Sequence, residues 1–83
     1  MNKVLIELHI PAISEHFDIF VPIDVPIGTL SKIIADGVAE ISDDSYVISG
    51  YEQLCLRDPT GLLSPRCSLQ DYGIKDGMQL YLI

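Results

Sequence analysis

The first hydrophobic pattern along the chain is an alternation over residues 3–10. Its apolar positions of one parity are Val4, Ile6, Leu8 and Ile10. A period of two residues with one apolar face is typical of a half-buried β-strand. Pro11 follows directly and is expected to end this strand, because proline lacks a backbone N–H donor.

A second alternation follows a turn region that we expect at residues 11–16. Its apolar positions of one parity are Phe17, Ile19, Val21, Ile23, Val25 and Ile27. Pro22 and Pro26 occupy the other parity, where each removes one backbone donor. Prolines within strands are confined to sheet edges, so the pattern predicts a long strand, or a strand with an extended continuation, at an edge.

After Gly28 the hydrophobic pattern becomes helical. The apolar positions, spaced i, i+3, i+4, i+8 and i+11, are Leu30, Ile33, Ile34, Val38 and Ile41. This stripe predicts an amphipathic helix, with Gly28 ending the preceding strand and Thr29 as the N-cap. Gly37 lies on the stripe and is expected to let the helix approach the sheet closely. Because Gly lowers helix propensity by about 1 kcal/mol, tertiary packing is expected to hold the helix.

The last part of the chain alternates short apolar runs with turn residues. Gly73 suits a left-handed position after a tight helical turn at residues 69–74, and a last strand is expected at residues 78–83. The sequence Asp-Pro-Thr-Gly at residues 58–61 is typical of a reverse turn. The other expected pieces are an extended segment at residues 46–48, a strand at 53–57 and a return strand at 62–63.

This order of elements predicts an α+β fold of the β-grasp type. One helix then crosses a mixed sheet of strand order 2-1-5-3-4, in which the first and last strands pair in parallel. The 83 residues suffice for a single domain, residues 1–83. The expected core consists of Val4, Ile6, Leu8, Ile19, Val21, Leu30, Ile33, Ile34, Val38, Leu54, Leu56, Leu69, Leu80 and Leu82.

The charge balance argues against nucleic acid as a partner. The chain has 5 Lys and Arg against 12 Asp and Glu, a net charge of −7. Nucleic-acid binding depends on basic residues that neutralise phosphates, and the same acidity opposes docking on anionic membranes. The chain shows neither a run that could insert into a membrane nor a leader pattern, so a cytoplasmic location is expected. With 48% apolar residues, some hydrophobic side chains are expected at the surface.

Cys55 with His9 or His16 is the first candidate for a catalytic pair. The expected strand order places the last strand between Cys55 and His9, roughly 9–10 Å apart, which is beyond hydrogen-bond reach. His16 falls in the first turn region. Cys55 and Cys67 lack metal-ligand spacing, and the adjacent acids at residues 43–44 lack the pattern of a cation loop. We therefore expect no catalysis, no metal and no cofactor.

The constellation that favours a function is the sheet face opposite the helix. Its expected residues are Leu5, Phe20, Cys55, Arg57, Tyr81 and Ile83. Aromatic and arginine side chains on an apolar platform are typical of protein-binding hot spots. The alternatives are an ordinary scatter of exposed apolar residues and a self-associating homodimer. Tyr72 is expected to pack over its own turn, with its hydroxyl bonded to nearby backbone.

Two motifs resemble those of known families. Residues 69–74, Leu-Gln-Asp-Tyr-Gly-Ile, are similar to the segment Leu-Ser-Asp-Tyr-Asn-Ile before the last strand of ubiquitin. Residues 18–30 read Asp-Ile-x-x-Pro-x-Asp-Val-Pro-x-x-x-Leu, which resembles the motif Asp-Leu-x-Leu-Pro-x-Asp-Val-Pro-x-x-x-Leu of ubiquitin-like proteins in bacterial type VII secretion. A second motif common in those proteins is matched by Leu69, Asp71, Gly73, Ile74, Gly77 and Leu80.

The resemblance covers nearly the whole chain and includes both the small free-standing YukD/EsaB proteins and the N-terminal domain of the EccD membrane component. It implies a non-enzymatic accessory protein, recruited to the inner face of the membrane by a membrane ATPase or membrane subunit of the machine. The sequence ends at Leu82-Ile83 without the Gly-Gly tail of ubiquitin, so conjugation is not expected. A free-standing protein is favoured over an excised EccD-like domain, a sulfur carrier or tag, and a generic β-grasp binding module.

Overall fold

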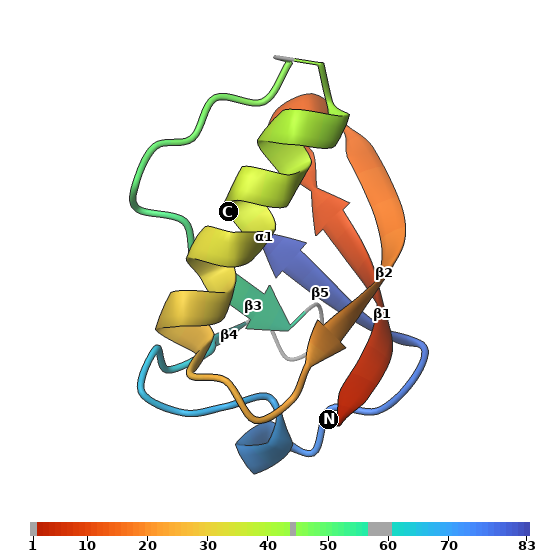
Figure 1. The fold of residues 1–83 in the computed structure, drawn as a ribbon, viewed down its shortest axis with the longest axis vertical. Helices are drawn as coiled ribbons and strands as arrows, with labels where there is room; N and C mark the ends of the chain where they lie inside the picture. The colour runs from red at the N-terminus through yellow and green to blue at the C-terminus, as the bar shows by residue number, and fades with distance from the viewer. Residues whose placement is uncertain (1, 44, 57–60) are drawn as a thin grey trace.

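The structure is a computed structural model that describes residues 2–43, 45–56 and 61–83. Its elements follow the expected order of strand, strand, helix and short strands (Figure 1). They are β1 (Lys3–Ile10), η1 (Pro11–Ile13), β2 (Glu15–Pro22), α1 (Ile27–Ile41), β3 (Leu54–Leu56), β4 (Gly61–Leu62), η2 (Gln70–Tyr72) and β5 (Met78–Leu82). Among the described residues, no helix has the length and apolar character needed to cross a membrane.

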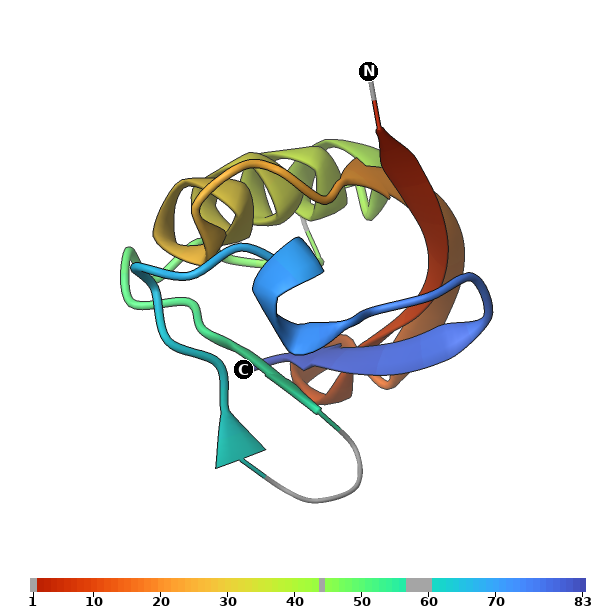
Figure 2. The ribbon, with the colours of Figure 1, turned by 90° about the horizontal axis from the view of Figure 1, so that it is seen from below.

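The strands form one mixed sheet in the order β2-β1-β5-β3-β4. β1 pairs antiparallel with β2 and parallel with β5, while β3 pairs antiparallel with both β5 and β4. α1 crosses one face of this sheet, as Figure 1 and Figure 2 show. The α+β β-grasp predicted from the sequence is therefore confirmed. β2 lies at an edge, as its prolines indicate.

The core lies between α1 and the sheet, and most of its expected members are buried. Ile19 and Leu56 are only partly buried. Ile33 contradicts the expected core because it is 56% exposed, and Ile41, which the helical stripe includes but the expected core does not, is 59% exposed. Both lie on the side of α1 that is turned toward solvent. Buried apolar residues outside the expected core are Ile10, Ile27, Ala35, Tyr46, Leu63 and Ile74.

The start of α1 differs from the expectation. The helix begins at Ile27, directly after Pro26, so Gly28 and Thr29 lie inside its first turn and no side chain caps it. The free N–H groups of Ile27 and Gly28 instead donate to the carbonyl oxygens of Cys67 and Pro65, at 2.8 and 3.0 Å. A neighbouring backbone segment therefore replaces the side-chain cap.

The extended segments are shorter than the hydrophobic pattern predicts. β2 ends at Pro22, and the remaining apolar alternation belongs to an irregular connection in which Pro26 bridges Ser68. The first turn is also shorter than expected, because β2 already begins at Glu15 after Ser14 in a left-handed conformation. Residues 46–48 form no strand, and the return strand β4 begins at Gly61. The turn expected at 58–61 falls mostly outside the described residues.

The tight turn before the last strand has the predicted form. η2 is followed by Gly73 at φ 67°, a left-handed conformation that glycine adopts without steric cost. The Tyr72 hydroxyl accepts a hydrogen bond from the backbone N–H of Ser64 at 2.8 Å. Tyr72 thus bonds the backbone, as expected, and ties η2 to the segment that supports the start of α1.

Candidate functional site

The sheet face turned away from α1 is built by the odd-numbered positions of β1 and their neighbours on the other strands. On β1 the even positions are buried, whereas Leu5, Glu7 and His9 remain partly accessible. Phe20 pairs with Leu5, and Asp18 pairs with Glu7. The face therefore carries the residue types that the sequence places there, but their arrangement depends on the register of each pair.

The register creates a row of side chains that crosses all five strands, which we call the aromatic row. Tyr81 pairs with His9 on β1 and with Cys55 on β3. His9 in turn pairs with His16 of β2, and Cys55 pairs with Leu62 of β4. The row thus runs in the order His16, His9, Tyr81, Cys55 and Leu62.

Ring stacking joins three members of the aromatic row. The His9 ring lies 4.9 Å from the Tyr81 ring with an interplanar angle of 13°. It lies 5.4 Å from the His16 ring on its other side, with an angle of 23°. Stacked planar rings offer a partner a rigid surface that loses little conformational entropy on binding. His9 and His16, considered at the sequence level only as partners of Cys55, therefore belong to the face.

The six predicted face residues do not form one continuous patch. Phe20 and Leu5 lie together at one end, and Phe20 is 69% exposed. Tyr81 is adjacent to His9 rather than to Leu5, and the polar residues Glu7, Asp18 and Gln79 lie between the two groups. The expected row of Phe20, Leu5, Tyr81 and Cys55 is correct in strand order but not in register.

Glu7 connects the polar residues to the aromatic row. Its carboxylate oxygen Oε2 lies 2.6 Å from Nε2 of His9. The hydrogen bond from His9 lowers the pKa of Glu7 below its usual value. The contact with Glu7 holds the His9 ring in the orientation in which it stacks on Tyr81. Among the described residues, no group of three or more His, Cys, Asp or Glu side chains is placed to hold a metal ion.

Cys55 occupies the aromatic row as a free thiol. Burial raises its pKa, so the reactive thiolate is less available than in an exposed cysteine. Tyr81 lies between Cys55 and His9 in the sheet, as the strand order predicts. Because Tyr81 separates the two side chains, His9 is not placed to act as a base for the Cys55 thiol.

Of the two remaining predicted face residues, Ile83 and Arg57, the structure describes Ile83 alone. Ile83 follows β5, is 57% exposed, and extends the ladder by two backbone hydrogen bonds with Gln53, at 2.8 and 2.9 Å. It has the parity of Tyr81. Arg57 lies outside the described residues, and its place on the face stays a prediction.

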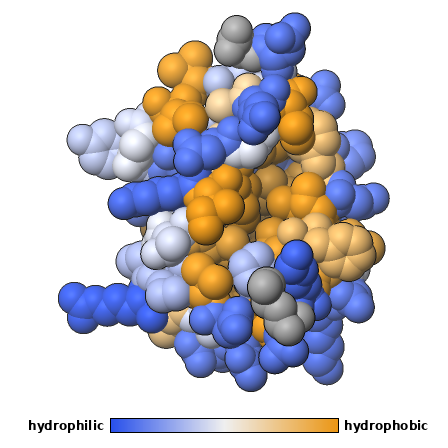
Figure 3. Space-filling model, viewed as in Figure 1, coloured by the Kyte–Doolittle hydropathy of each residue, from blue (hydrophilic) through white to orange (hydrophobic). Residues whose placement is uncertain are grey.

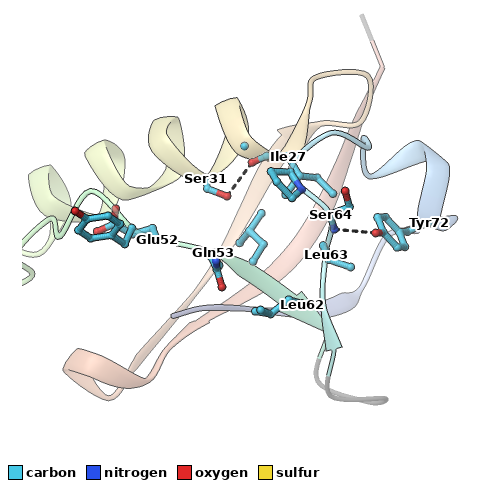
Figure 4. Close-up of a pocket in the computed structure, with 12 residues that line it drawn as sticks. Ile27, Ser31, Glu52, Gln53, Leu62, Leu63, Ser64 and Tyr72 are labelled. Atoms are coloured by element: carbon cyan, nitrogen blue, oxygen red, sulfur yellow. Dashed lines mark hydrogen bonds between the residues drawn. The ribbon is translucent and has the colours of Figure 1, made fainter.

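A hollow of ≈ 390 Å³ lies elsewhere, between the first turn of α1 and the segments around Gln53 and Ser64 (Figure 4). Its polar groups serve the fold. The Ser31 hydroxyl donates to the Ile27 carbonyl oxygen at 2.8 Å, and the Ser64 N–H donates to Tyr72. Among the described residues, no buried side-chain nitrogen or oxygen lacks a hydrogen-bond partner. In the described part of the chain, the hollow is therefore lined by no buried side-chain nitrogen or oxygen that lacks a partner.

Glu52 organises the loop that borders this hollow. Its carboxylate accepts hydrogen bonds from the Tyr46 hydroxyl at 3.0 Å and from the backbone N–H groups of Ser49 and Gly50 at 2.6 and 3.1 Å. Burial raises the pKa of Glu52, but the hydrogen bonds together outweigh burial and leave it lowered. The loop is thus held by an ionised carboxylate with a structural role.

The fold is shared with solved ubiquitin-like domains. The ubiquitin-like domain of the type VII secretion protein EccD1 from Mycobacterium tuberculosis has a TM-score of 0.79 and 21% identity, over 100% of this chain and 99% of that one. The ubiquitin-like domain of EccD5 from Mycobacterium xenopi has a TM-score of 0.73 and 20% identity, over 100% and 94%. A chain of the ESX-5 inner membrane complex has a TM-score of 0.72 and 18% identity, over 100% of this chain and 21% of that one.

Comparisons of the sequence itself give a different result. No family model matches the chain, and no curated protein matches it. At the identities found, the likeness to the solved structures establishes a ubiquitin-like fold, and a fold of this kind serves many functions.

Proposed function

We propose that this chain is a non-enzymatic, ubiquitin-like accessory protein of a bacterial type VII secretion system. It binds a protein component of the machine non-covalently through its sheet face, without conjugation. The partner is a membrane ATPase or a membrane subunit, which recruits the chain from the cytoplasm to the inner face of the membrane. The observation that carries the proposal is the aromatic row, five side chains in register across all five strands.

The chemistry of the row supports a protein partner. Stacked His9, His16 and Tyr81 give a flat surface, and Leu62 is 58% exposed at its end. Aromatic side chains supply much of the binding energy at protein interfaces. The second group, Leu5 and Phe20, adds an apolar contact beyond the polar residues, while Arg57 and Ile83 complete the proposed face.

Type VII secretion is supported by two separate observations. The motif at residues 18–30 resembles that of ubiquitin-like proteins from these systems. Solved structures that share the fold over the whole chain include the domains of EccD1 and EccD5 and a chain of the ESX-5 inner membrane complex. The free-standing YukD/EsaB-like form is the proposal. The alternative is the cytoplasmic domain of an EccD-like membrane protein, which the full-length gene distinguishes.

The proposal is tested by affinity capture from the native host with identification of type VII components. Tyr81→Ala should weaken capture of the membrane ATPase or membrane subunit at least tenfold, a change of about 1.4 kcal/mol that is typical of a hot-spot residue. Leu5→Asp should weaken it as well. Tyr51→Ala is the matched control, because Tyr51 is 86% exposed and lies in the loop before β3, off the sheet face.

Thermal unfolding must show that all three variants keep the fold. Equal capture by wild type, Tyr81→Ala and Leu5→Asp would overturn the face assignment. Failure to enrich any type VII component would overturn the assignment to secretion. Sedimentation velocity of the purified protein addresses the rival use of the face, because a homodimer that Tyr81→Ala dissociates would make a second copy the partner.

A further inference from the structure

The middle of the sheet face is polar and negatively charged. Asp18 of β2, Glu7 of β1 and Gln79 of β5 lie side by side across three strands, and we call them the middle row. Leu5 and Phe20 lie on one side of the middle row, and the aromatic row lies on its other side. Along the strands the face therefore presents an apolar group, an acidic group and an aromatic group in that order.

The two acids of the middle row oppose each other. Glu7 and Asp18 are direct partners in the antiparallel ladder. Side chains in such pairs begin about 4.5–5.5 Å apart, and like charges there are destabilising. His9 contacts Glu7, but no ion pair to Asp18 is formed among the described residues. Even a protonated His9 cancels at most one of the two negative charges, so the middle row keeps a charge that lacks a partner.

Basic side chains on the strands do not compensate this charge. Lys3 is the one Lys or Arg that β1 and β2 contain, and β3, β4 and β5 contain none. Lys3 lies opposite Pro22 and four residues from Glu7, a Cα separation of about 13 Å. Arg57 follows β3 and lies outside the described residues. The repulsion between the two acids is thus a feature that a positively charged partner can relieve.

The geometry of a sheet face favours a helix as the partner segment. Ladder hydrogen bonds lie between the strands, so the face offers side chains but no free backbone groups. A segment that docks there must satisfy its own backbone N–H and C=O groups, as an α-helix does. From Leu5 to His9 the face extends over four residues of β1, about 13 Å. Eight residues of a helix extend over about 12 Å, so positions i, i+4 and i+8 match the three groups of the face.

The middle row favours arginine as the cation at position i+4. A guanidinium group is planar, carries five N–H donors and can bond two carboxylates at once. It also stacks on aromatic rings. The His9 ring, which contacts Glu7 and stacks on Tyr81, borders the middle row on the aromatic side. A lysine ammonium is a point charge that lacks this planar fork.

We propose that the sheet face binds a partner helix that carries one arginine between two apolar residues. The arginine bonds Asp18 and Glu7. One apolar residue contacts Leu5 and Phe20, and the other contacts the aromatic row. This inference deepens the proposed function and rests on it only in that a protein docks on the sheet face. It requires no assignment to secretion.

The test uses an 18-residue fluorescent peptide of Ala and Gln in which Leu, Arg and Leu follow at intervals of four residues. A second peptide has citrulline, which resembles arginine in shape but has no charge, in place of Arg. In fluorescence anisotropy the wild type should bind the arginine peptide at least tenfold more tightly. This advantage should shrink as the salt concentration rises. A third peptide with Pro at its centre, which breaks the helix, should bind at least tenfold more weakly than the arginine peptide.

Matched variants locate the charge that the arginine contacts. Asp18→Asn should reduce affinity for the arginine peptide at least fivefold and leave the citrulline peptide unchanged. Asp36→Asn removes the same charge from exposed Asp36 of α1 and should change neither. Figure 3 shows this helix side of the molecule, where hydrophilic side chains lie on both sides of a hydrophobic band. Tyr81→Ala should weaken both peptides equally, because Tyr81 contacts an apolar residue of the helix.

The free protein provides a second readout. Asp18→Asn should raise the unfolding temperature, because it removes the repulsion from Glu7. The same measurement excludes misfolding as the cause of weaker binding. A lower unfolding temperature would overturn the inference, because the carboxylates would then already be paired within the chain.

The binding data separate this inference from the proposed function. Equal affinity of the wild type for the arginine and citrulline peptides, or no binding of the arginine peptide, would overturn the inference. If Tyr81→Ala still weakened both peptides, the docking face itself would stand. An arginine preference that depends on Asp18 but not on Tyr81 would instead support the inference and contradict the aromatic row as the source of affinity. Self-association that Asp18→Asn abolishes would overturn the inference by making a second copy of the chain the occupant.

Discussion

Gly28 lies in the first turn of α1, against the backbone of Pro65. A Cβ at residue 28 would lie 3.1 Å from the Pro65 Cβ and 3.3 Å from its carbonyl oxygen. The Gly28 N–H also donates to that oxygen. The close approach thus supplies the cap that the helix lacks, and any side chain at this position would force the two segments apart. The need for glycine at position 28 therefore comes from its contact with Pro65, which is distant in the sequence.

Gly28→Ala and Gly37→Ala form a matched pair that tests this contact. Both replace glycine within α1, where alanine is favoured by up to about 1 kcal/mol. Gly37→Ala should gain stability of that order because its Cβ meets nothing. Gly28→Ala should lose about 1–2 kcal/mol through overpacking against Pro65. Urea unfolding measures both changes, and equal gains in the two variants would contradict the close packing.

Tyr46 makes stability depend on pH in the alkaline range. Burial of its hydroxyl, and then its hydrogen bond to Glu52, raise its pKa from 10.0 to about 12. The folded state therefore holds this proton more tightly than the unfolded chain. The stabilising contribution is complete below pH 10 and is lost as the pH rises through 12.

Tyr46→Phe isolates this effect because phenylalanine does not titrate. Between pH 8 and pH 11.5 the wild type should lose on the order of 2 kcal/mol more free energy of unfolding than the variant. The variant is expected to be less stable at pH 8, where the hydrogen bond to Glu52 is intact. Urea midpoints of both proteins at the two pH values provide the measurement. A constant difference between them would refute the raised pKa.

At the scale of elements, α1 shows why a hydrophobic stripe overestimates burial. Ile33 and Ile34 are adjacent, and the helical period assigns both to the core. The structure buries Ile34 to 5% exposure and leaves Ile33 at 56%. The helix covers only part of the sheet and stops short of closing over β2, so one border of a wide apolar stripe remains in contact with solvent.

Replacing Ile33 or Ile34 with alanine tests whether the first is exposed and the second is buried in solution, because the two changes should affect stability differently. Ile34→Ala removes buried methyl groups and should cost about 2–5 kcal/mol. Ile33→Ala should change stability by less than about 1 kcal/mol, because little buried area is lost and alanine has the higher helix propensity. Denaturant unfolding under identical conditions compares them. Similar large losses at both positions would show that Ile33 is packed in solution.

For the whole molecule, strand order was predictable and strand register was not. Alternation fixes which face a side chain occupies, and the helical segment after two strands leaves few topologies. Parity, however, is unchanged by a shift of two residues, so it cannot decide whether Leu5 or His9 lies beside Tyr81. The register is set by long-range contacts such as the Gly77 N–H bonded to the Leu5 carbonyl oxygen at 2.8 Å. The sequence therefore predicts which side chains share a sheet face, but not the order in which the aromatic row brings them together, and binding through that face stays a proposal.

The parallel pairing of β1 with β5 joins the two ends of the sequence at the centre of the sheet. Both strands have neighbours on each side, and Leu8 and Leu80 are fully buried between them and α1. Their amides should exchange with solvent only through global unfolding, whereas amides of the two-residue edge strand β4 should exchange through local opening at much lower free energy.

Native-state hydrogen exchange followed by NMR, with added denaturant, measures this difference directly. The amides of Leu8 and Leu80 should give opening free energies equal to that of unfolding, and both should fall together as denaturant rises. Leu62 of β4 should open at a free energy several kcal/mol lower and with little denaturant dependence. Equal protection at all three positions would mean that the edge is as stable as the centre. Low protection at Leu80 alone would mean that β5 separates from β1 before the rest of the fold, and the aromatic row would then be a transient surface.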